Sequence, residues 1–194
     1  MKILSYFFML VLISGCDLFS TRIPESPDNN RIKFQPPTSA QIVIDNFILS
    51  ITNKNVENFS QCLSDSNSGN YKFVFLPSTE ASINYQNLFN DWEKSDEVKV
   101  MNSIFANLDD KSPKLSFSNT GFEQLTPDSA IFISAYTLIV PHSLDNIPKE
   151  FSGLLQFTIA HNNSQLWSII RWIDYSNNDS LHNSWSILKA FFYN

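Results

Sequence analysis

The sequence predicts an α+β domain, in which N-terminal helices pack on a curved, mostly antiparallel sheet. Three observations predict this fold class. Apolar residues recur at helical spacing before Pro113, and beyond Pro113 they alternate with polar residues at the period of two that strands require. Bulky side chains are plentiful, with 17 Phe, 6 Tyr and 4 Trp, whereas glycine occurs only 4 times. The chain therefore has enough aromatic bulk to fill one packed core.

Two amphipathic helices are expected at the start of the domain. Thr38 or Ser39 can cap the first helix, because a hydroxyl oxygen accepts a hydrogen bond from a free N–H of the first turn. Asn55 can cap a second, shorter helix after the polar residues 52–54. The apolar stripes of the two helices consist of Ala40, Ile44, Phe47, Ile48 and Ile51, and of Val56, Phe59, Cys62 and Leu63.

A strand is expected over 71–76, where aromatic residues alternate with other residues and place Phe73 and Phe75 on one face. Pro77 stops this strand, because proline lacks the N–H group that a sheet ladder needs. The polar segment 78–91 follows, and it can be either a lid or an exposed loop.

A third helix is expected over 92–108, where helical spacing returns. Its first turn carries Glu93, Asp96 and Glu97, and the helix dipole favours acidic side chains there. Antiparallel strands follow, with Asn162-Asn163 as a tight turn between the last two. These strands cover Leu115 to Phe117 and residues 130–140, 151–161 and 165–175, and the final apolar segment, 185–192, can be a short helix or a strand.

The N-terminus has the pattern of an export signal. Lys2 precedes an apolar run from Ile3 to Ile13, which suits a signal peptide and is shorter than the roughly 20 residues that a spanning helix needs. The tetrad Ile13-Ser14-Gly15-Cys16 resembles the lipobox of bacterial lipoproteins. This resemblance implies a signal peptide over 1–15 and a lipid attached to Cys16. The exported chain is then anchored to a bacterial membrane, in the cell envelope, and faces outside the cytoplasm.

Composition divides the exported chain further. Residues 16–37 are rich in Pro, Ser and Asn and are expected to form a disordered tether, which leaves 38–194 as the domain.

The whole chain has a formal net charge of −6. No nucleic-acid partner is expected, because an acidic protein repels a phosphate backbone. If Cys16 is acylated, Cys62 has no partner for a disulfide, and its place on an apolar helix stripe predicts a buried thiol.

The order of these elements resembles that of the NTF2-like superfamily, also called the SnoaL-like or cystatin-like α+β cone. The stretches that carry the resemblance are residues 37–63 for the opening helices, 71–75 for the first strand, Asp91-Trp92-Glu93 before the third helix, 166–174 for the closing strand and 184–189 for the terminal segment. The resemblance implies a cone-shaped fold. It implies little about activity, because this fold hosts isomerases, dehydratases, transport adaptors and binding domains.

An isomerase in such a cone would need a carboxylate base opposite donors that stabilise an enolate. Asp45, Tyr136 and Asp174 are candidates, although they are scattered along the chain. Arg171 and Asp174 differ by three positions, which places them on opposite faces of one strand. We therefore expect no catalytic set.

No metal and no cofactor is expected either. His142, His161 and His182 lie too far apart in the sequence for metal-ligand spacing. The sequence has no Gly-x-Ser-x-Gly elbow that would single out a nucleophile, and its glycines do not form a phosphate-binding loop.

If the cone holds a pocket, we expect Trp92, Arg171, Trp172 and Trp185 to line it, the tryptophans providing contact area and Arg171 an anion-binding fork. The same tryptophans can instead serve only as core packing. The leading hypothesis is a membrane-anchored domain that binds a small apolar ligand or a protein partner without catalysis, with the open sheet face available for a homodimer. The alternative is a small lyase or isomerase acting on an apolar metabolite, which requires a deep cavity and a carboxylate of raised pKa.

Overall fold

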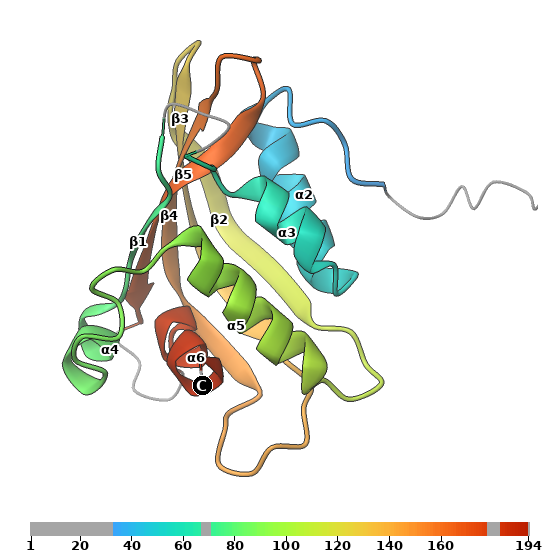
Figure 1. Ribbon diagram of the computed structural model, residues 1–194, viewed down its shortest axis with the longest axis vertical. Coiled ribbons are helices and arrows are strands. Elements are labelled where there is room, and N and C mark those ends of the chain that lie inside the picture. The colour runs from blue at the N-terminus through green and yellow to red at the C-terminus, as the bar shows by residue number, and fades with distance from the viewer. Residues whose placement is uncertain (1–32, 67–70, 178–182, 194) are drawn as a thin grey trace, which may run out of the picture. The chain divides into compact units, whose positions relative to one another are not determined.

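The computed structural model describes residues 33–66, 71–177 and 183–193 (Figure 1). Lys33–Asn194 form one compact unit. The signal peptide expected over 1–15, the lipid-attachment residue Cys16 and the tether as far as residue 32 lie outside the described residues. Within the described residues, no helix is long and apolar enough to cross a membrane.

The last residues assigned to the tether pack on the domain. The backbone N–H of Gln35 donates to Asn46 Oδ1 at 3.0 Å, and the Asn46 amide donates to the Gln35 carbonyl at 2.7 Å. The Trp167 N–H donates to the Pro37 carbonyl at 2.7 Å, and Phe34 packs against the core. These bonds satisfy polar groups that would otherwise need water. Residues 33–37 therefore belong with the domain.

The two predicted N-terminal helices form with the predicted caps. α2 (Ala40–Thr52) begins after Ser39, whose hydroxyl accepts the Ile42 N–H at 3.4 Å. α3 (Val56–Cys62) begins after Asn55, whose side-chain oxygen accepts the Asn58 N–H at 2.8 Å. Their apolar stripes face the core, and all members are buried except Ile48 and Val56, which are partly buried.

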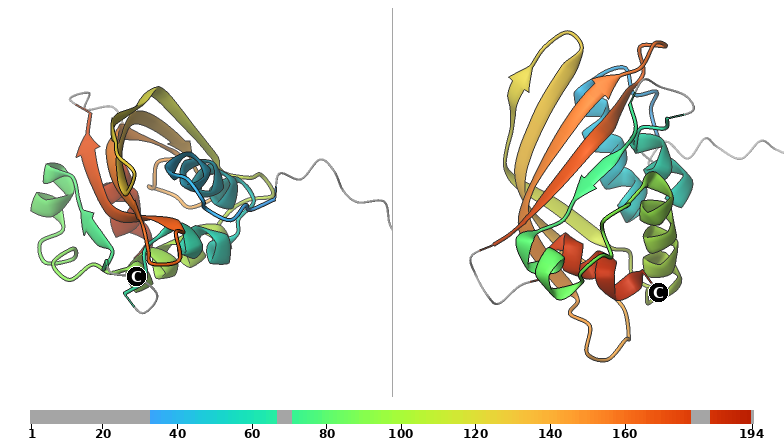
Figure 2. Two further views of the ribbon diagram at one scale, coloured as in Figure 1. Left: turned by 90° about the horizontal axis from the view of Figure 1, so that it is seen from above. Right: turned by 60° about the vertical axis from the view of Figure 1, so that its left-hand side comes forward.

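A five-stranded sheet forms the second layer, in the order β1-β5-β4-β3-β2. Its strands are β1 (Val74–Leu76), β2 (Lys114–Leu125), β3 (Ser129–Ile139), β4 (Glu150–His161) and β5 (Trp167–Ser176). β1 runs parallel to β5, whereas the other neighbouring strands are antiparallel. Register shifts after Ser118 in β2 and after Thr158 in β4 mark bends in a sheet that curves around α2 (Figure 2).

Three further helices close the domain. α5 (Lys94–Ala106) begins with a capping box, in which Glu93 and Asp96 each accept the other's backbone N–H. α4 (Thr79–Asn84) lies in the segment that was expected to be a lid or a loop, and Ser78 caps it. The terminal apolar segment is a helix, α6 (Trp185–Phe192), and not a strand.

Aromatic rings fill the space between the helices and the sheet. The ring centroid of Phe47 in α2 lies 5.2 to 5.8 Å from those of Phe59, Phe157, Trp172 and Trp185. Trp172 and Trp185 meet edge to face at 4.8 Å. Each such contact adds about 0.5–1.5 kcal/mol beyond the burial of its area. The cone is therefore packed with its own side chains at this level.

Candidate functional site

The structure brings three of the four predicted pocket residues close to one another. Trp172 of β5 and Trp185 of α6 touch, and they are only 0% and 1% exposed. Trp92 is 6% exposed, and its ring centroid lies 5.9 Å from that of Phe75. The ring centroid of Phe75 lies in turn 5.5 Å from that of Trp172. Trp172 and Trp185 leave almost no surface open to a ligand. Ligand binding by these residues stays a prediction.

Arg171 lies apart from the three tryptophans. It is exposed and pairs across the sheet with Val74 and Thr158. Trp172 and Asp174 face inward from the same strand, and alternate side chains of a strand point to opposite faces. Arg171 therefore points outward, and an anion held by its guanidinium would lie outside the cone.

Two of the scattered acid–base candidates meet inside the cone. The Tyr136 hydroxyl donates to Asp174 Oδ1 at 2.8 Å and accepts the Trp185 N–H at 2.6 Å. Ser186 donates its backbone N–H at 2.7 Å and its hydroxyl at 2.5 Å to Asp174 Oδ2. Burial raises the pKa of Tyr136 well above its usual value, and the Asp174 carboxylate raises it further. Asp45, the third candidate, lies on the exposed side of α2.

Gly153 makes room for this pair. Gly153 of β4 lies directly across the sheet from Tyr136 of β3. A Cβ atom at position 153 would lie 2.7 Å from the Tyr136 hydroxyl oxygen and would overlap with the Tyr175 carbonyl oxygen. Only glycine therefore lets Tyr136 reach Asp174 without a shift of the backbone.

A second buried polar cluster joins α5 to α6. Lys189 Nζ lies 2.5 Å from Glu97 Oε1, and both side chains are 1% exposed. Trp92 Nε1 donates to the same carboxylate oxygen at 2.7 Å. The Lys189 ammonium also lies 3.2 Å from the ring centroid of Phe75 and 3.5 Å from that of Trp172, where the negative faces of the rings attract a cation.

Burial disfavours both charges of this pair. It lowers the pKa of Lys189 to about 8 and raises the pKa of Glu97, and the attraction between the two groups opposes each shift only in part. The pair was not expected from the sequence, in which Glu97 was interpreted as a helix-dipole residue. The sequence feature that could have indicated this pair is Lys189, the single lysine inside the apolar segment 185–192.

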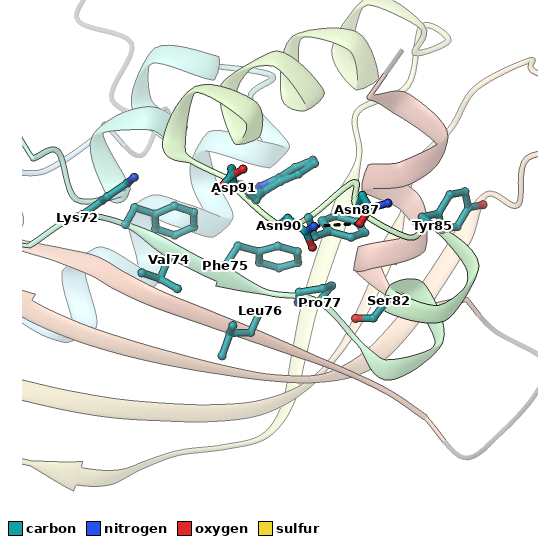
Figure 3. Close-up of a pocket in the computed structure, with 13 residues that line it drawn as sticks. Lys72, Val74, Phe75, Leu76, Pro77, Ser82, Tyr85, Asn87, Asn90 and Asp91 are labelled. Carbon is teal, nitrogen blue, oxygen red and sulfur yellow. Dashed lines mark hydrogen bonds between the residues drawn. The ribbon is translucent and has the colours of Figure 1, made fainter.

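Three hollows of the described surface lie beside the packed cone, and Trp92 is the predicted pocket residue that lines one of them. One of about 470 Å³ lies between β1 and the segment that leads to α5 (Figure 3). Two others, of about 370 and 410 Å³, adjoin Ser64 and Lys94. None of these three hollows is lined by Phe47, Trp172 or Trp185.

The described residues hold no group of three or more His, Cys, Asp or Glu side chains that could bind a metal ion. His142 is buried, His161 pairs with Asp128 at 3.1 Å, and His182 lies outside the described part of the chain. Burial raises the pKa of the Cys62 thiol to about 12, so Cys62 is a protonated core residue and not a nucleophile.

Comparisons with known proteins identify the fold. No family model matches the sequence, and no curated protein matches it. An NTF2-like superfamily protein from Salmonella enterica serovar Typhimurium has a TM-score of 0.53 at 8% identity, covering 71% of this chain and 88% of that chain. A proposed scytalone dehydratase from Novosphingobium aromaticivorans has a TM-score of 0.53 at 10% identity, covering 75% and 89%.

A third structure, an NTF2-like protein of unknown function in nutrient uptake from Rhodospirillum rubrum, has a TM-score of 0.50 at 10% identity, covering 72% of this chain and 98% of that chain. At such low identities the likeness concerns the fold and does not carry a reaction across. The chain therefore has the NTF2-like fold, an α+β cone with N-terminal helices on a curved, mostly antiparallel sheet.

Proposed function

We propose that this chain is a lipoprotein of the bacterial cell envelope whose NTF2-like domain binds a small ligand or a protein partner and catalyses no reaction. One observation carries the proposal for the domain. Residues of α6 fill the cone and bond to both of its buried carboxylates: Ser186 donates to Asp174 Oδ2, and Lys189 donates to Glu97 Oε1. Binding is then a property of the outer surface, where the hollows lie.

The alternative, a lyase or isomerase, is less well supported. Glu97 is a buried carboxylate of raised pKa, as a cone enzyme would need. However, Lys189 faces Glu97 at 2.5 Å, and Ser186 and Trp185 use the bonding positions around Asp174 and Tyr136. A substrate would have to displace α6 before it could reach either carboxylate.

A ligand screen tests this choice. The domain is heated with and without each member of a set of apolar metabolites, and the melting temperature is recorded. We expect any stabilising compound to leave the amide resonances of Tyr136 and Asp174 unchanged, because it binds outside. A compound that shifts both resonances and is chemically altered on incubation would favour the enzyme.

The proposed lipid anchoring in the cell envelope rests on the sequence Ile13-Ser14-Gly15-Cys16. Growth of a producing bacterium with an alkyne-labelled fatty acid, followed by dye coupling, should label the protein in the membrane fraction. Cys16→Ser should abolish the label, whereas Cys62→Ala is the matched control and should keep it, because Cys62 is a buried core residue. Label that persists in Cys16→Ser would contradict lipidation at this residue.

A homodimer through the sheet is part of the proposal. The outer faces of β3 and β4 have no helix over them in Figure 2. Leu154 of β4 pairs across the sheet with Tyr175 of the neighbouring strand β5, and the two are 38% and 42% exposed. Exposed apolar neighbours of this kind favour association. Light scattering should give a dimer mass for the wild type and for Leu144→Lys, whose leucine is equally exposed in a loop, and a monomer mass for Leu154→Lys. A monomeric wild type would remove the dimer from the proposal.

A further inference from the structure

The hollow beside β1 is lined by side chains from both faces of the strand. Its lining includes the consecutive residues 72–77 (Figure 3). Because successive side chains of a strand point to opposite faces, a hollow on one face would be lined by every second residue only. The hollow therefore lies against the edge of β1. Figure 3 agrees, with Phe75 on one side of the β1 ribbon and Val74 and Leu76 on the other.

This edge is free. β1 is the end strand of the sheet and pairs with β5 on one side. The wall opposite consists of Ser82, Tyr85, Asn87 and residues 89–92, and no hydrogen bond among the described residues joins this wall to β1. A strand edge presents backbone N–H and C=O groups in a row, and these groups pair best with another extended backbone.

The walls of the hollow suit a peptide. Val74 and Leu76, which are 40% and 37% exposed, supply apolar surface. The lining also includes the buried rings of Phe75, Phe89 and Trp92, whose centroids lie within 5.9 Å of one another, so that their positions are fixed. Asn87 and Asn90 place their side-chain amides at the opposite wall, joined by a hydrogen bond of 3.1 Å. Amide groups donate and accept, as a peptide backbone requires.

The charges of the hollow specify the peptide further. Lys72 is neutralised by Glu93 at 2.5 Å. Asp91 is exposed and has no ion-pair partner among the described residues, although it lines the same hollow. One negative charge is therefore left unbalanced, and a basic side chain of the occupant would complement it.

We propose that this hollow is a docking site for an extended peptide segment of a partner protein, which adds a strand to the free edge of β1 and carries alternating apolar residues and a basic residue for Asp91. Residues 72–77 span roughly 17–20 Å when extended, which corresponds to a peptide of about six residues. The proposal rests on the partner-binding function proposed above and gives that function a site and a class of partner.

The probe is a pool of capped heptapeptides in which Val, Leu or Phe alternates with Ser, Thr or Lys. The protein is the chain from Asp17 onward, which contains the whole compact unit Lys33–Asn194. We expect binding, measured by fluorescence anisotropy, together with shifts of the backbone amides of Val74 and Leu76 and of the side-chain amides of Asn87 and Asn90.

Two comparisons separate strand addition from loose apolar contact. Methylation of alternate backbone nitrogens of the bound peptide removes N–H donors and keeps every side chain, so it should weaken binding at least tenfold. Asp91→Lys should weaken binding of the basic peptides by a similar factor and should favour a second pool in which Glu replaces Lys. Asp145→Lys makes the same charge change at an exposed loop residue outside the hollow and should leave binding unchanged.

Several outcomes overturn the proposal: no binding by the pool, binding that tolerates N-methylation, equal binding to Asp91→Lys and the wild type, or resonance shifts confined to other surfaces. If one of these outcomes occurs while Cys16 is still labelled and no metabolite of the ligand screen is chemically altered, the proposed function stands and only this site is removed. Loss of the label together with turnover of a metabolite would instead remove the proposed function.

Discussion

Replacing Lys189 with Met tests whether the buried ion pair holds α6 in the cone. Methionine has a similar length, so the packing against Phe75 and Trp172 is largely kept. The change leaves Glu97 as a buried carboxylate whose Oε1 keeps only the Trp92 N–H and whose Oε2 has no partner. Removal of one member of a buried pair costs about 3–5 kcal/mol. The free energy of unfolding from urea denaturation should fall by that amount.

A double variant separates the pair from general damage to the core. Glu97→Gln combined with Lys189→Met leaves no buried charge, and the glutamine oxygen can still accept the Trp92 N–H. We expect the double variant to lose at most about 1.5 kcal/mol, so that the second substitution offsets most of the cost of Lys189→Met. This coupling is the thermodynamic signature of a paired charge.

The cost of Lys189→Met should grow with pH. Burial lowers the pKa of Lys189 to about 8, so the unfolded chain binds more protons than the folded wild type from there to 10.5, and the wild type gains stability as pH rises through this window. In the wild type the Lys189 cation partly offsets the raised pKa of Glu97. Without that cation the pKa lies further above the 4.5 of the unfolded chain, so the variant loses more stability than the wild type as pH rises. Both effects widen the difference between pH 7 and pH 10, and other titrating groups are common to the two proteins.

Two results would refute this reasoning. One is a loss below about 1 kcal/mol for Lys189→Met at pH 7, which is the range of exposed pairs. The other is a double variant as unstable as the two single variants added together, because independent sites behave in that way.

Three other substitutions test the packing of the cone. Burial raises the pKa of the Cys62 thiol to about 12 from the 9.0 of the unfolded chain, so this one group lowers stability by about 1.4 kcal/mol between pH 7 and pH 10. In urea denaturation, the free energy of unfolding of the wild type minus that of Cys62→Ala should fall by this amount over the same range, and an unchanged difference would contradict this. Gly153→Ala should cost about 1–3 kcal/mol, read from the melting temperature, because the new methyl group overlaps with the Tyr136 hydroxyl. Trp185→Ala should cost about 3–5 kcal/mol and regain part of that on addition of indole, whereas the half-buried Trp167→Ala should gain nothing from indole.

Local signals predicted the layers of the fold. Ser39 and Asn55 cap the first two helices as their hydrogen-bonding chemistry requires, and the alternation in 130–140 and 151–161 marks β3 and β4 nearly to the residue. The short helix α4 was missed, because its sequence is polar and its stability comes from Ala81, buried against the rest of the fold, and not from an apolar stripe.

The contents of the cone could not be predicted in the same way. Apolar periodicity gives the face of a helix or strand that points inward, but it is identical for a cone with an open pocket and for one filled by its own rings. Tyr136 and Asp174 were both noted as candidates, yet only the register of β3, β4 and β5 brings them within 2.8 Å. Arg171 and Trp172 are adjacent in β5, yet Arg171 lies on the outer face of the sheet and Trp172 lies in the core.

The position of α6 decides where this domain can act. This helix of 8 residues supplies Trp185, Ser186 and Lys189, and each of them bonds to or packs against an interior group. A ligand that displaced α6 would leave Asp174 with only the Tyr136 hydroxyl and Glu97 with only the Trp92 N–H, and it would have to provide a cation and several hydrogen-bond donors in the same geometry. An apolar metabolite has neither, and each buried carboxylate left without its partner costs several kcal/mol. Recognition is therefore favoured at the outer surface, where the closed cone holds the edge of β1 and its facing wall in fixed positions and no interior contact has to break before a partner binds.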